Sequence, residues 1–250
     1  MKESTQRVAV VTGGGSGIGA ATCMRLARDG FAVAVWDRNL AGAQETAAQI
    51  EREGGNAAAI HVDVADPDSV NRAAAATRET LGPTSALVNC AGIRDLIPFL
   101  EIKPADWHKV IDVCLAGPFY CTQALAADMI KLGGGSVVNI SSINGLASRP
   151  DRTAYVSAKT GLVGLTRSNA EDLGPRGIRV NAVCPGWITT PLQAVSSVRP
   201  ESQNLEEKIP LRRIGKPEDV ADVVSFFCSD SSRYVTGTAL AVDGGRLIVY

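Results

Sequence analysis

Histidine and clustered cysteine are scarce in this chain. Its 250 residues include two histidines and six cysteines, and no two cysteines form a CxxC pair. Zinc sites need closely spaced Cys and His ligands, and disulfide frameworks are typical of small, cysteine-dense secreted domains. We therefore expect no metal site. The thiols are expected to be reduced and mostly buried, in a cytoplasmic protein.

A marked excess of charge is also absent. The formal net charge is −1, and no basic block is longer than Arg212-Arg213. This balance gives no electrostatic support for a nucleic acid or an anionic membrane as a partner. The N-terminal stretch MKESTQRVAVV has no apolar run like that of a signal peptide. No segment is expected to reach the roughly 18 apolar residues of a membrane span. A small molecule is the expected partner.

What the chain does contain is a regular alternation of short apolar, β-branched runs with longer helical stretches. The predicted strands are Val8–Val11, Ala32–Trp36, Ala57–Val62, Ser85–Asn89, Ser136–Ile140, Arg179–Val183 and Ala239–Asp243. The predicted helices are one ending near Arg28, then Ala41–Arg52, Ser69–Thr80, Pro104–Lys131, Ala154–Leu173 and Glu218–Cys228. This alternation predicts an α/β fold with a single domain over residues 1–250. Its core would be a doubly wound parallel sheet of about seven strands, with helices on both faces.

One long irregular segment, Gly186–Arg213, follows the sixth predicted strand. In a compact domain a loop of this length is usually functional. We therefore expect this segment to act as a lid over a substrate.

A glycine cluster, TGGGSGIG, lies between the first predicted strand and the first helix, at Thr12–Gly19. Glycines at such a turn let the chain reverse tightly. They also let backbone N–H groups approach a pyrophosphate at the helix N-terminus, where the helix dipole favours negative charge. The turn therefore predicts a Rossmann-type dinucleotide site.

The end of the second predicted strand suggests which dinucleotide binds. Asp37 stands there, and a carboxylate at this place accepts hydrogen bonds from the adenosine ribose and repels a 2′-phosphate. Arg38, the next residue, is a natural partner for that phosphate. The sequence favours NAD over NADP and leaves both open.

A tyrosine and a lysine lie one helical turn apart in AYVSAKTG, as Tyr155 and Lys159. Residues at this spacing are neighbours on any helix, and such a pair can simply lie on a wet surface. Alternatively, a nearby ammonium favours the phenolate and turns the hydroxyl into an acid/base. The spacing alone does not decide between these interpretations.

With these motifs the chain resembles the short-chain dehydrogenase/reductase family along essentially its whole length. The matching elements are Thr12–Gly19 for TGxxxGIG, Asp63-Val64, NCAG at Asn89–Gly92 for the family's NNAG, NISS at Asn139–Ser142, the pair Tyr155 and Lys159, Pro185-Gly186, and Thr236–Gly245. Each motif alone is weak, but their order and spacing together are specific. The resemblance implies an oxidoreductase with a nicotinamide cofactor, assembled as a homotetramer.

The resemblance also assigns roles to residues. Tyr155 would be the general acid/base, Lys159 would favour its phenolate and bind the nicotinamide ribose, and Ser142 would hydrogen-bond the substrate oxygen. The residues expected to bind the cofactor are Gly13, Ser16, Gly17, Ile18, Gly19, Asp37, Arg38, Asp63, Val64, Asn89, Ala91, Gly92, Tyr155, Lys159, Pro185, Gly186, Ile188 and Thr190.

One catalytic position departs from the family pattern. The family has an asparagine where its long helix deviates, and this chain has Cys114 there, in VCLAGPF. A thiol is a weaker donor and acceptor than an amide. The departure puts the proton relay behind Lys159 in question. We expect main chain and water to serve the relay instead.

The substrate is the least defined part of the prediction. Candidate contacts in the loops that would wall the pocket are Arg94, Asn144, Arg152 and Trp187. The segment after NCAG differs from the methionine-rich stretch of 3-oxoacyl-carrier-protein reductases. We therefore expect an NAD(H)-dependent enzyme that interconverts a secondary alcohol and a ketone. The alternatives are an NADPH-dependent 3-oxoacyl-thioester reductase, acting on carrier protein or CoA substrates, and a catalytically silent NAD-binding scaffold.

Overall fold

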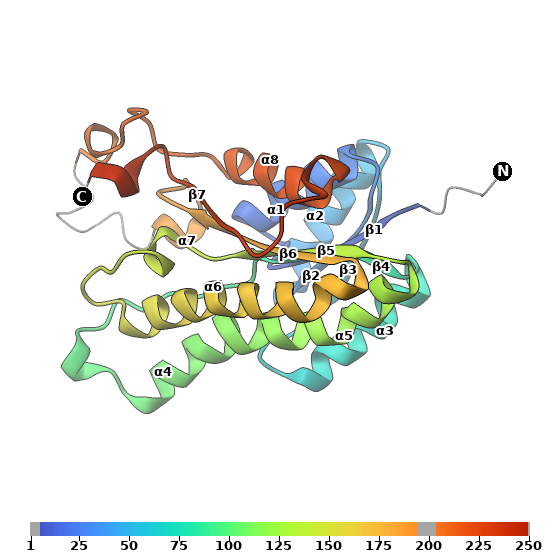
Figure 1. Cartoon of the computed structure of the whole chain (residues 1–250), viewed down its shortest axis with the longest axis horizontal. Helices are drawn as coiled ribbons and strands as arrows, with labels where there is room; N and C mark the ends of the chain where they lie inside the picture. The colour runs from blue at the N-terminus through green and yellow to red at the C-terminus, as the bar shows by residue number, and fades with distance from the viewer. Residues whose placement is uncertain (1–5, 195–203, 250) are drawn as a thin grey trace.

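Seven parallel strands form a single sheet through the centre of the protein (Figure 1). The computed structural model describes residues 6–194 and 204–249. The strands are β1 (Val8–Thr12), β2 (Ala32–Asp37), β3 (Asn56–His61), β4 (Thr84–Asn89), β5 (Gly135–Ile140), β6 (Ile178–Pro185) and β7 (Ala239–Val242). Their order across the sheet is β3-β2-β1-β4-β5-β6-β7. The predicted doubly wound α/β sheet is confirmed. Its strand order reverses between β1 and β4, where ligands of such sheets bind.

Helices cover both faces of the sheet (Figure 1). One layer consists of α1 (Gly17–Arg28), α2 (Leu40–Arg52) and α8 (Pro217–Cys228). The opposite layer consists of α3 (Pro67–Thr80), α5 (Gly117–Lys131) and α6 (Thr153–Leu173), with α4 (Pro104–Ile111) leading into α5. A four-residue helix, α7 (Pro191–Ala194), follows β6 and was not predicted.

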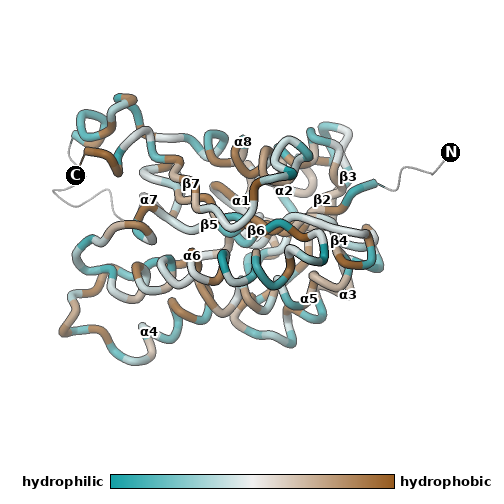
Figure 2. The backbone as a smooth tube through the Cα atoms, viewed as in Figure 1, coloured by the Kyte–Doolittle hydropathy of each residue, from teal (hydrophilic) through white to brown (hydrophobic). Residues whose placement is uncertain are grey.

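The sheet separates two hydrophobic cores. Along β1, Ala9 and Val11 pack into the core beneath α1, α2 and α8, whereas Val10 packs into the core on the α3, α5 and α6 side. Side chains alternate between the faces of a strand, and here both faces are buried. This explains why the strands read as continuous apolar runs. Figure 2 shows many of the hydrophilic segments in the outer turns.

The predicted helix over residues 104–131 is continuous but not regular. A π-helical turn, Asp112–Ala116, joins α4 to α5. Pro118 has no N–H to donate to the carbonyl of Cys114, four residues earlier, and a missing donor of this kind is a known cause of a widened turn. The helix therefore deviates at Cys114, as the family resemblance predicts.

This helical stretch also corrects one prediction. Pro104–Lys131 is long and apolar enough to cross a bilayer by length and composition, with a mean hydropathy of 1.4. The expectation that no segment would reach this limit was wrong. In the structure, Cys121, Leu125 and Met129 of α5 are buried in the core on the α3, α5 and α6 side. A core helix of a soluble protein passes the same test.

A polar group is buried where α3, α5 and β4 meet. Asp128 is 3% exposed and accepts from Arg78 Nε at 2.8 and 2.9 Å. The same carboxylate accepts from the backbone N–H of Thr84 at 3.3 Å, and Arg78 also donates to the carbonyl of Ala124 at 2.7 Å. These bonds tie two helices to the start of a central strand.

We predict that Asp128→Ala lowers the free energy of unfolding by about 2 kcal/mol, because the substitution leaves Arg78 and the Thr84 N–H without their shared acceptor. Urea unfolding followed by circular dichroism measures the change. Asp172→Ala, at an exposed position of α6, is the control and should leave the stability nearly unchanged. Equal effects of the two substitutions would contradict this role of Asp128.

Candidate active site

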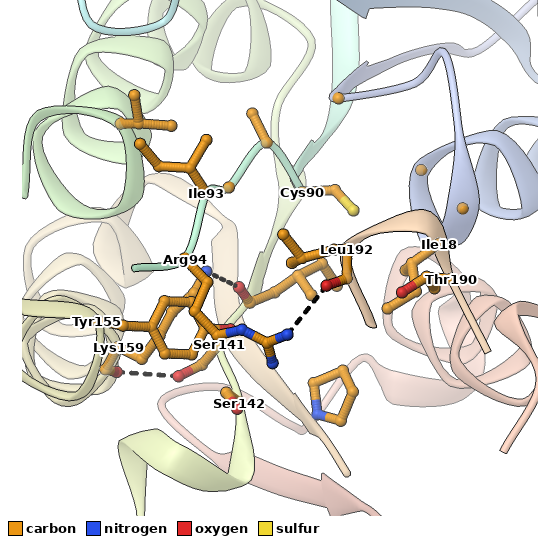
Figure 3. A pocket seen from close by; sticks show the side chains of 18 of the residues that line it. Ile18, Cys90, Ile93, Arg94, Ser141, Ser142, Tyr155, Lys159, Thr190 and Leu192 are labelled. Carbon is orange, nitrogen blue, oxygen red and sulfur yellow. Dashed lines mark hydrogen bonds between the residues drawn. The ribbon is translucent and has the colours of Figure 1, made fainter. Parts of the chain in front are cut away.

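A cavity of about 330 Å³ lies at the carboxyl ends of the strands and brings the predicted site residues together. It is lined by the glycine turn, the ends of β2 and β5, the loop after β4, the start of α6 and the segment after β6. All the residues predicted for the site line it except Asn89 and Cys114. Figure 3 shows Tyr155, Lys159, Ser142 and Arg94 around this cavity.

The glycine turn has the shape of a phosphate cradle. Gly13 and Gly17 adopt positive φ angles of +67° and +53°, which side chains rarely allow. A Cβ on Gly19 would lie 2.0 Å from the carbonyl oxygen of Gly13. Helix α1 begins at Gly17 with no side-chain cap and no acidic residue in its first turn. Its N-terminal N–H groups and dipole therefore fit a pyrophosphate.

Asp37 is fixed at the end of β2. Its Oδ2 accepts from the backbone N–H of Gly15 at 2.9 Å, and its Oδ1 accepts from that of Asn39 at 2.8 Å. Both bonds hold the carboxylate at the cavity, beside the glycine turn. Arg38 lines the same cavity and is exposed. The arrangement fits the adenosine ribose of a dinucleotide.

The loop after β4 is held by Thr12. The Thr12 hydroxyl oxygen accepts from the backbone N–H groups of Cys90 and Ala91, both at 3.0 Å. Asn89, which was predicted to bind the cofactor, points elsewhere: its amide donates to Asn139 Oδ1 at 2.8 Å. It is 3% exposed and links β4 to β5. The side chain of Asn89 therefore joins two strands and does not line the cavity.

Tyr155 and Lys159 are a buried pair rather than surface neighbours. They are 7% and 4% exposed, and Lys159 Nζ lies 5.7 Å from the centre of the Tyr155 ring. Lys159 Nζ donates to the carbonyl of Ile140 at 2.8 Å, and the Ser141 hydroxyl donates to the carbonyl of Lys159 at 2.9 Å. These two bonds hold α6 against the end of β5. The pair therefore brings a phenol and an ammonium to one sheltered wall of the cavity.

Ser142 follows β5 and faces the same cavity. Its side-chain oxygen accepts from the backbone N–H of Asn144 at 3.1 Å, which caps the 3₁₀ turn Ile143–Gly145. Because that bond uses only an acceptor site, the hydroxyl proton can be donated to a ligand oxygen.

Cys114 lies just outside the cavity and holds part of its wall. The Ile93 N–H donates to Cys114 Sγ at 3.4 Å, and the thiol donates to the Ile93 carbonyl at 3.3 Å. The thiol thus makes one accepting and one donating contact, as an amide side chain can. A Cβ on Gly92, next to Ile93, would lie 3.6 Å from Lys159 Nζ and 3.7 Å from Cys114 Sγ. Cys114 therefore supports the loop that faces Lys159.

The sequence analysis did not single out five residues of the cavity wall, which are Val62, Cys90, Val113, Ile140 and Ser141. The cavity is also lined by residues of the loops and the lid that were expected to wall it, namely Ile93, Ile143, Pro191 and Leu192. Cys90 is not a nucleophile at neutral pH, because burial raises the pKa of its thiol to about 12, although the charge of Lys159 lowers it. Ser141 stands inside the NISS motif, but only its contact with α6 reveals its role.

The substrate end of the cavity is closed by contacts between separate segments. Arg149 lies over the Trp187 ring, 5.4 Å from its centre. Arg94 donates to the carbonyl of Leu192 in α7 at 2.9 Å, across the cavity (Figure 3). The first part of the predicted lid therefore lines the site, while residues 195–203 lie outside the described part of the chain. Within that part, no group of three or more His, Cys, Asp or Glu residues is placed to hold a metal ion.

Comparison with known proteins gives a consistent picture. A family model described as Enoyl-(Acyl carrier protein) reductase matches residues 13–246. The human (3R)-3-hydroxyacyl-CoA dehydrogenase is 42% identical, over 95% of this chain and 94% of its own. A 3-oxoacyl-[acyl-carrier-protein] reductase from Synechocystis is 37% identical, over 99% of this chain and 100% of its own.

Solved structures agree on the fold. Levodione reductase superposes with a TM-score of 0.92 at 34% identity, covering 98% of this chain and 99% of the other. A candidate gluconate dehydrogenase from Agrobacterium tumefaciens superposes with a TM-score of 0.94 at 32% identity, covering 98% and 97%.

We predict that Cys114→Ala speeds hydrogen exchange at the Ile93 amide by about tenfold, because the amide loses its acceptor in the α4–α5 turn. Hydrogen exchange read by mass spectrometry or NMR measures it. Cys114→Ser keeps a donor and an acceptor and should retain most of the protection. Cys121→Ala removes an equally buried thiol from the same helical stretch and should leave Ile93 unaffected. Unchanged exchange in Cys114→Ala would show that the thiol does not hold the loop.

Proposed function

The chain belongs to the short-chain dehydrogenase/reductase family, and on that basis we propose that it interconverts a secondary alcohol and a ketone with NAD(H). Its relatives are dehydrogenases and reductases, and it is an oxidoreductase that acts on CH–OH groups. The observation that carries the proposal is the convergence of Ser142, Tyr155 and Lys159 on the cavity that the glycine turn also lines.

Each of the three side chains has a distinct task. In the direction of reduction, the Tyr155 hydroxyl donates its proton to the carbonyl oxygen of the substrate, and in oxidation the phenolate takes that proton back. Ser142 donates a hydrogen bond to the same oxygen and stabilises the charge that develops on it. Lys159, which lines the same cavity, would donate to the ribose of the cofactor. When bound, the nicotinamide supplies or accepts the hydride.

The alternative of a catalytically silent scaffold has less support. The complete set of Ser142, Tyr155 and Lys159 is present, and Cys114 keeps two contacts with the main chain of Ile93. Pro118 has no N–H and therefore cannot donate to the carbonyl of Cys114. That carbonyl is a suitable acceptor for a water in a proton relay.

The relatives favour a second candidate substrate. The curated relatives that match at 37–42% identity are 3-hydroxyacyl-CoA dehydrogenases and 3-oxoacyl-[acyl-carrier-protein] reductases. A 3-hydroxyacyl or 3-oxoacyl thioester is therefore the alternative to a small alcohol or ketone. Two solved structures bear the names of candidate gluconate dehydrogenases, which points to hydroxy acids as a further class.

We propose NAD rather than NADP as the cofactor because of Asp37. Its carboxylate is held by two backbone N–H groups at the ribose position and would repel a 2′-phosphate. The comparisons support a nicotinamide cofactor without deciding between the two, and one related structure carries bound NADP. Arg38 is the residue that would favour NADP.

We predict that Tyr155→Phe lowers kcat by on the order of 10²–10⁴-fold while NADH binding stays nearly normal, because only the transferable proton is lost. Lys159→Ala should weaken both turnover and NADH binding. Steady-state kinetics at the nicotinamide absorbance and fluorescence titration measure the two effects. Tyr120→Phe, in α5, is the control. If Tyr155→Phe kept most of its activity, the acid/base assignment would be wrong.

We predict that NADH binds at least tenfold more tightly than NADPH, because a 2′-phosphate would face the carboxylate of Asp37. Asp37→Ser should weaken the binding of NADH and reduce the difference in affinity between NADH and NADPH. Asp68→Ser, at an exposed position in α3, should leave both affinities unchanged. Fluorescence titration with both cofactors gives the ratio. Equal or tighter binding of NADPH would refute the NAD assignment and make Arg38 the deciding residue.

A further inference from the structure

We propose that Asn144 sets the specificity of the site by accepting a hydrogen bond from a second hydroxyl of the substrate, on the carbon next to the reacting one. The substrate is then a vicinal diol in the direction of oxidation and a 2-hydroxy ketone in the direction of reduction. The inference rests on the proposed function, because it takes Ser142 and Tyr155 as the groups that meet the reacting oxygen.

Asn144 has a buried acceptor that the protein does not use. The residue is 7% exposed and lines the cavity. Within the described part of the chain, no group donates a hydrogen bond to its side-chain oxygen Oδ1, which is itself buried. A buried acceptor without a donor destabilises the fold. A ligand in the cavity can supply the donor that the protein lacks.

The turn that carries Asn144 is held on two sides. It is the 3₁₀ turn Ile143–Gly145, which is closed by a bond from the Gly145 N–H to the carbonyl of Ser142 at 2.9 Å. A Cβ on Gly145 would lie 2.7 Å from the carbonyl oxygen of Lys159, so the turn packs directly against α6. The backbone therefore keeps the amide of Asn144 at the cavity and does not let it swing out into solvent.

Asn144 adjoins the place where the alcohol reacts. Its backbone N–H donates to Ser142 Oγ at 3.1 Å. Ser142 and Tyr155 line the same cavity (Figure 3), and in the proposed function the reacting oxygen lies between them. A side chain two residues after Ser142, in the same tight turn, is therefore placed to meet the carbon next to the reacting one. A distant part of a long substrate lies out of its reach.

A neutral hydroxyl is the donor that fits this place. A side-chain amide both accepts and donates, and so does a hydroxyl, so the two groups can pair in either direction. The last torsion of an asparagine side chain is broad, which lets the amide rotate to present Oδ1 to a ligand. An amino group would also donate, but as an ammonium it would be repelled by Lys159, which lines the same cavity.

This requirement distinguishes a diol from a 3-hydroxyacyl thioester. In the thioester, the two carbons next to the reacting one carry only hydrogen and alkyl groups. The nearest polar group beyond them is a carbonyl, which accepts hydrogen bonds but cannot donate one. Asn144 Oδ1 would stay without a donor when a thioester is bound. A diol supplies that donor on the adjacent carbon.

The reaction itself is balanced by the cofactor. The C–H bond of the reacting carbinol breaks, its hydride passes to NAD⁺, and the O–H proton passes to Tyr155. The products are a 2-hydroxy ketone, NADH and a proton, and the second hydroxyl is unchanged.

The test compares neutral substrates that differ in one hydrogen-bond donor. They are 2,3-butanediol, 3-methoxy-2-butanol, whose second oxygen cannot donate, and 2-butanol, which lacks that oxygen. Single stereoisomers are assayed with the wild-type protein and NAD⁺. We expect kcat/KM for the diol to exceed that for either other compound by about tenfold or more. Equal values for the diol and the ether would overturn the inference, because a water would then satisfy Asn144, and would leave the proposed function intact.

The CoA thioester of 3-hydroxybutyrate is assayed beside them. Turnover of the thioester without turnover of the diol would overturn the inference and select the thioester as the substrate class. NADH binding without turnover of any of the four compounds would reject the proposed function, and the inference with it.

Variants assign the preference to Asn144. Asn144→Leu has a similar volume and no acceptor, and it should remove the preference for the diol over the ether. Asn144→Asp keeps an acceptor and should retain the preference. Asn71→Leu makes the same substitution at an exposed position of α3 and should preserve the wild-type ratio. NADH titration shows whether each variant has folded. An unchanged ratio in folded Asn144→Leu would refute the assignment.

Thermal unfolding without ligands gives a readout that does not depend on turnover. Because Asn144→Leu removes a buried acceptor that has no donor, its Tm should equal or exceed that of the wild type. Lower Tm values in both Asn144→Leu and Asn144→Ala would show that the amide serves the fold, and would contradict the inference. If Asn144→Leu does not fold, the wild-type ratios and Asn144→Asp decide.

Discussion

The site depends on the way Lys159 joins α6 to β5. Its ammonium donates to the carbonyl of Ile140, while its own carbonyl accepts from Ser141. One residue thus makes both a side-chain bond and a main-chain bond with the same strand end. Because Ser142 leaves that strand end and Tyr155 lies one turn earlier on the same helix, these bonds fix the two groups relative to each other. A buried ammonium tolerates little displacement, since it would lose its acceptor.

Much of this arrangement was predictable because the alternation of apolar and helical segments in the sequence matches the alternation of strands and helices in the fold. Seven strands were expected, and all seven form one sheet. Each strand begins and ends within one or two residues of the predicted positions, as β3 does at Asn56–His61. The glycine turn, Asp37, Ser142, Tyr155 and Lys159 were expected at one site, and they line one cavity. Parallel strands place all their carboxyl ends at one edge, so the residues that follow them gather there.

What escaped prediction depends on contacts between distant segments. The side-chain amide of Asn89 points to Asn139 rather than to the cavity. The local sequence does not indicate in which direction a side chain at the end of a strand points. The same holds for Arg94, whose bond to Leu192 depends on a helix of four residues in an irregular segment. The apolar stretch Pro104–Lys131 was underestimated because its hydrophobic residues are dispersed along the helix. The homotetramer and the cytoplasmic location stay predictions.

Cys114 shows how a thiol at the bend of a helix can hold a neighbouring loop in place. The thiol accepts one hydrogen bond from the main chain of Ile93 and donates one to it. Pro118 favours the π-helical turn at this place whichever side chain residue 114 carries. To join the loop after β4 to this turn, a small side chain with one donor and one acceptor is enough, and the thiol provides both. A pattern search that demands asparagine at this position would pass over a chain in which a cysteine joins the turn and the loop in this way.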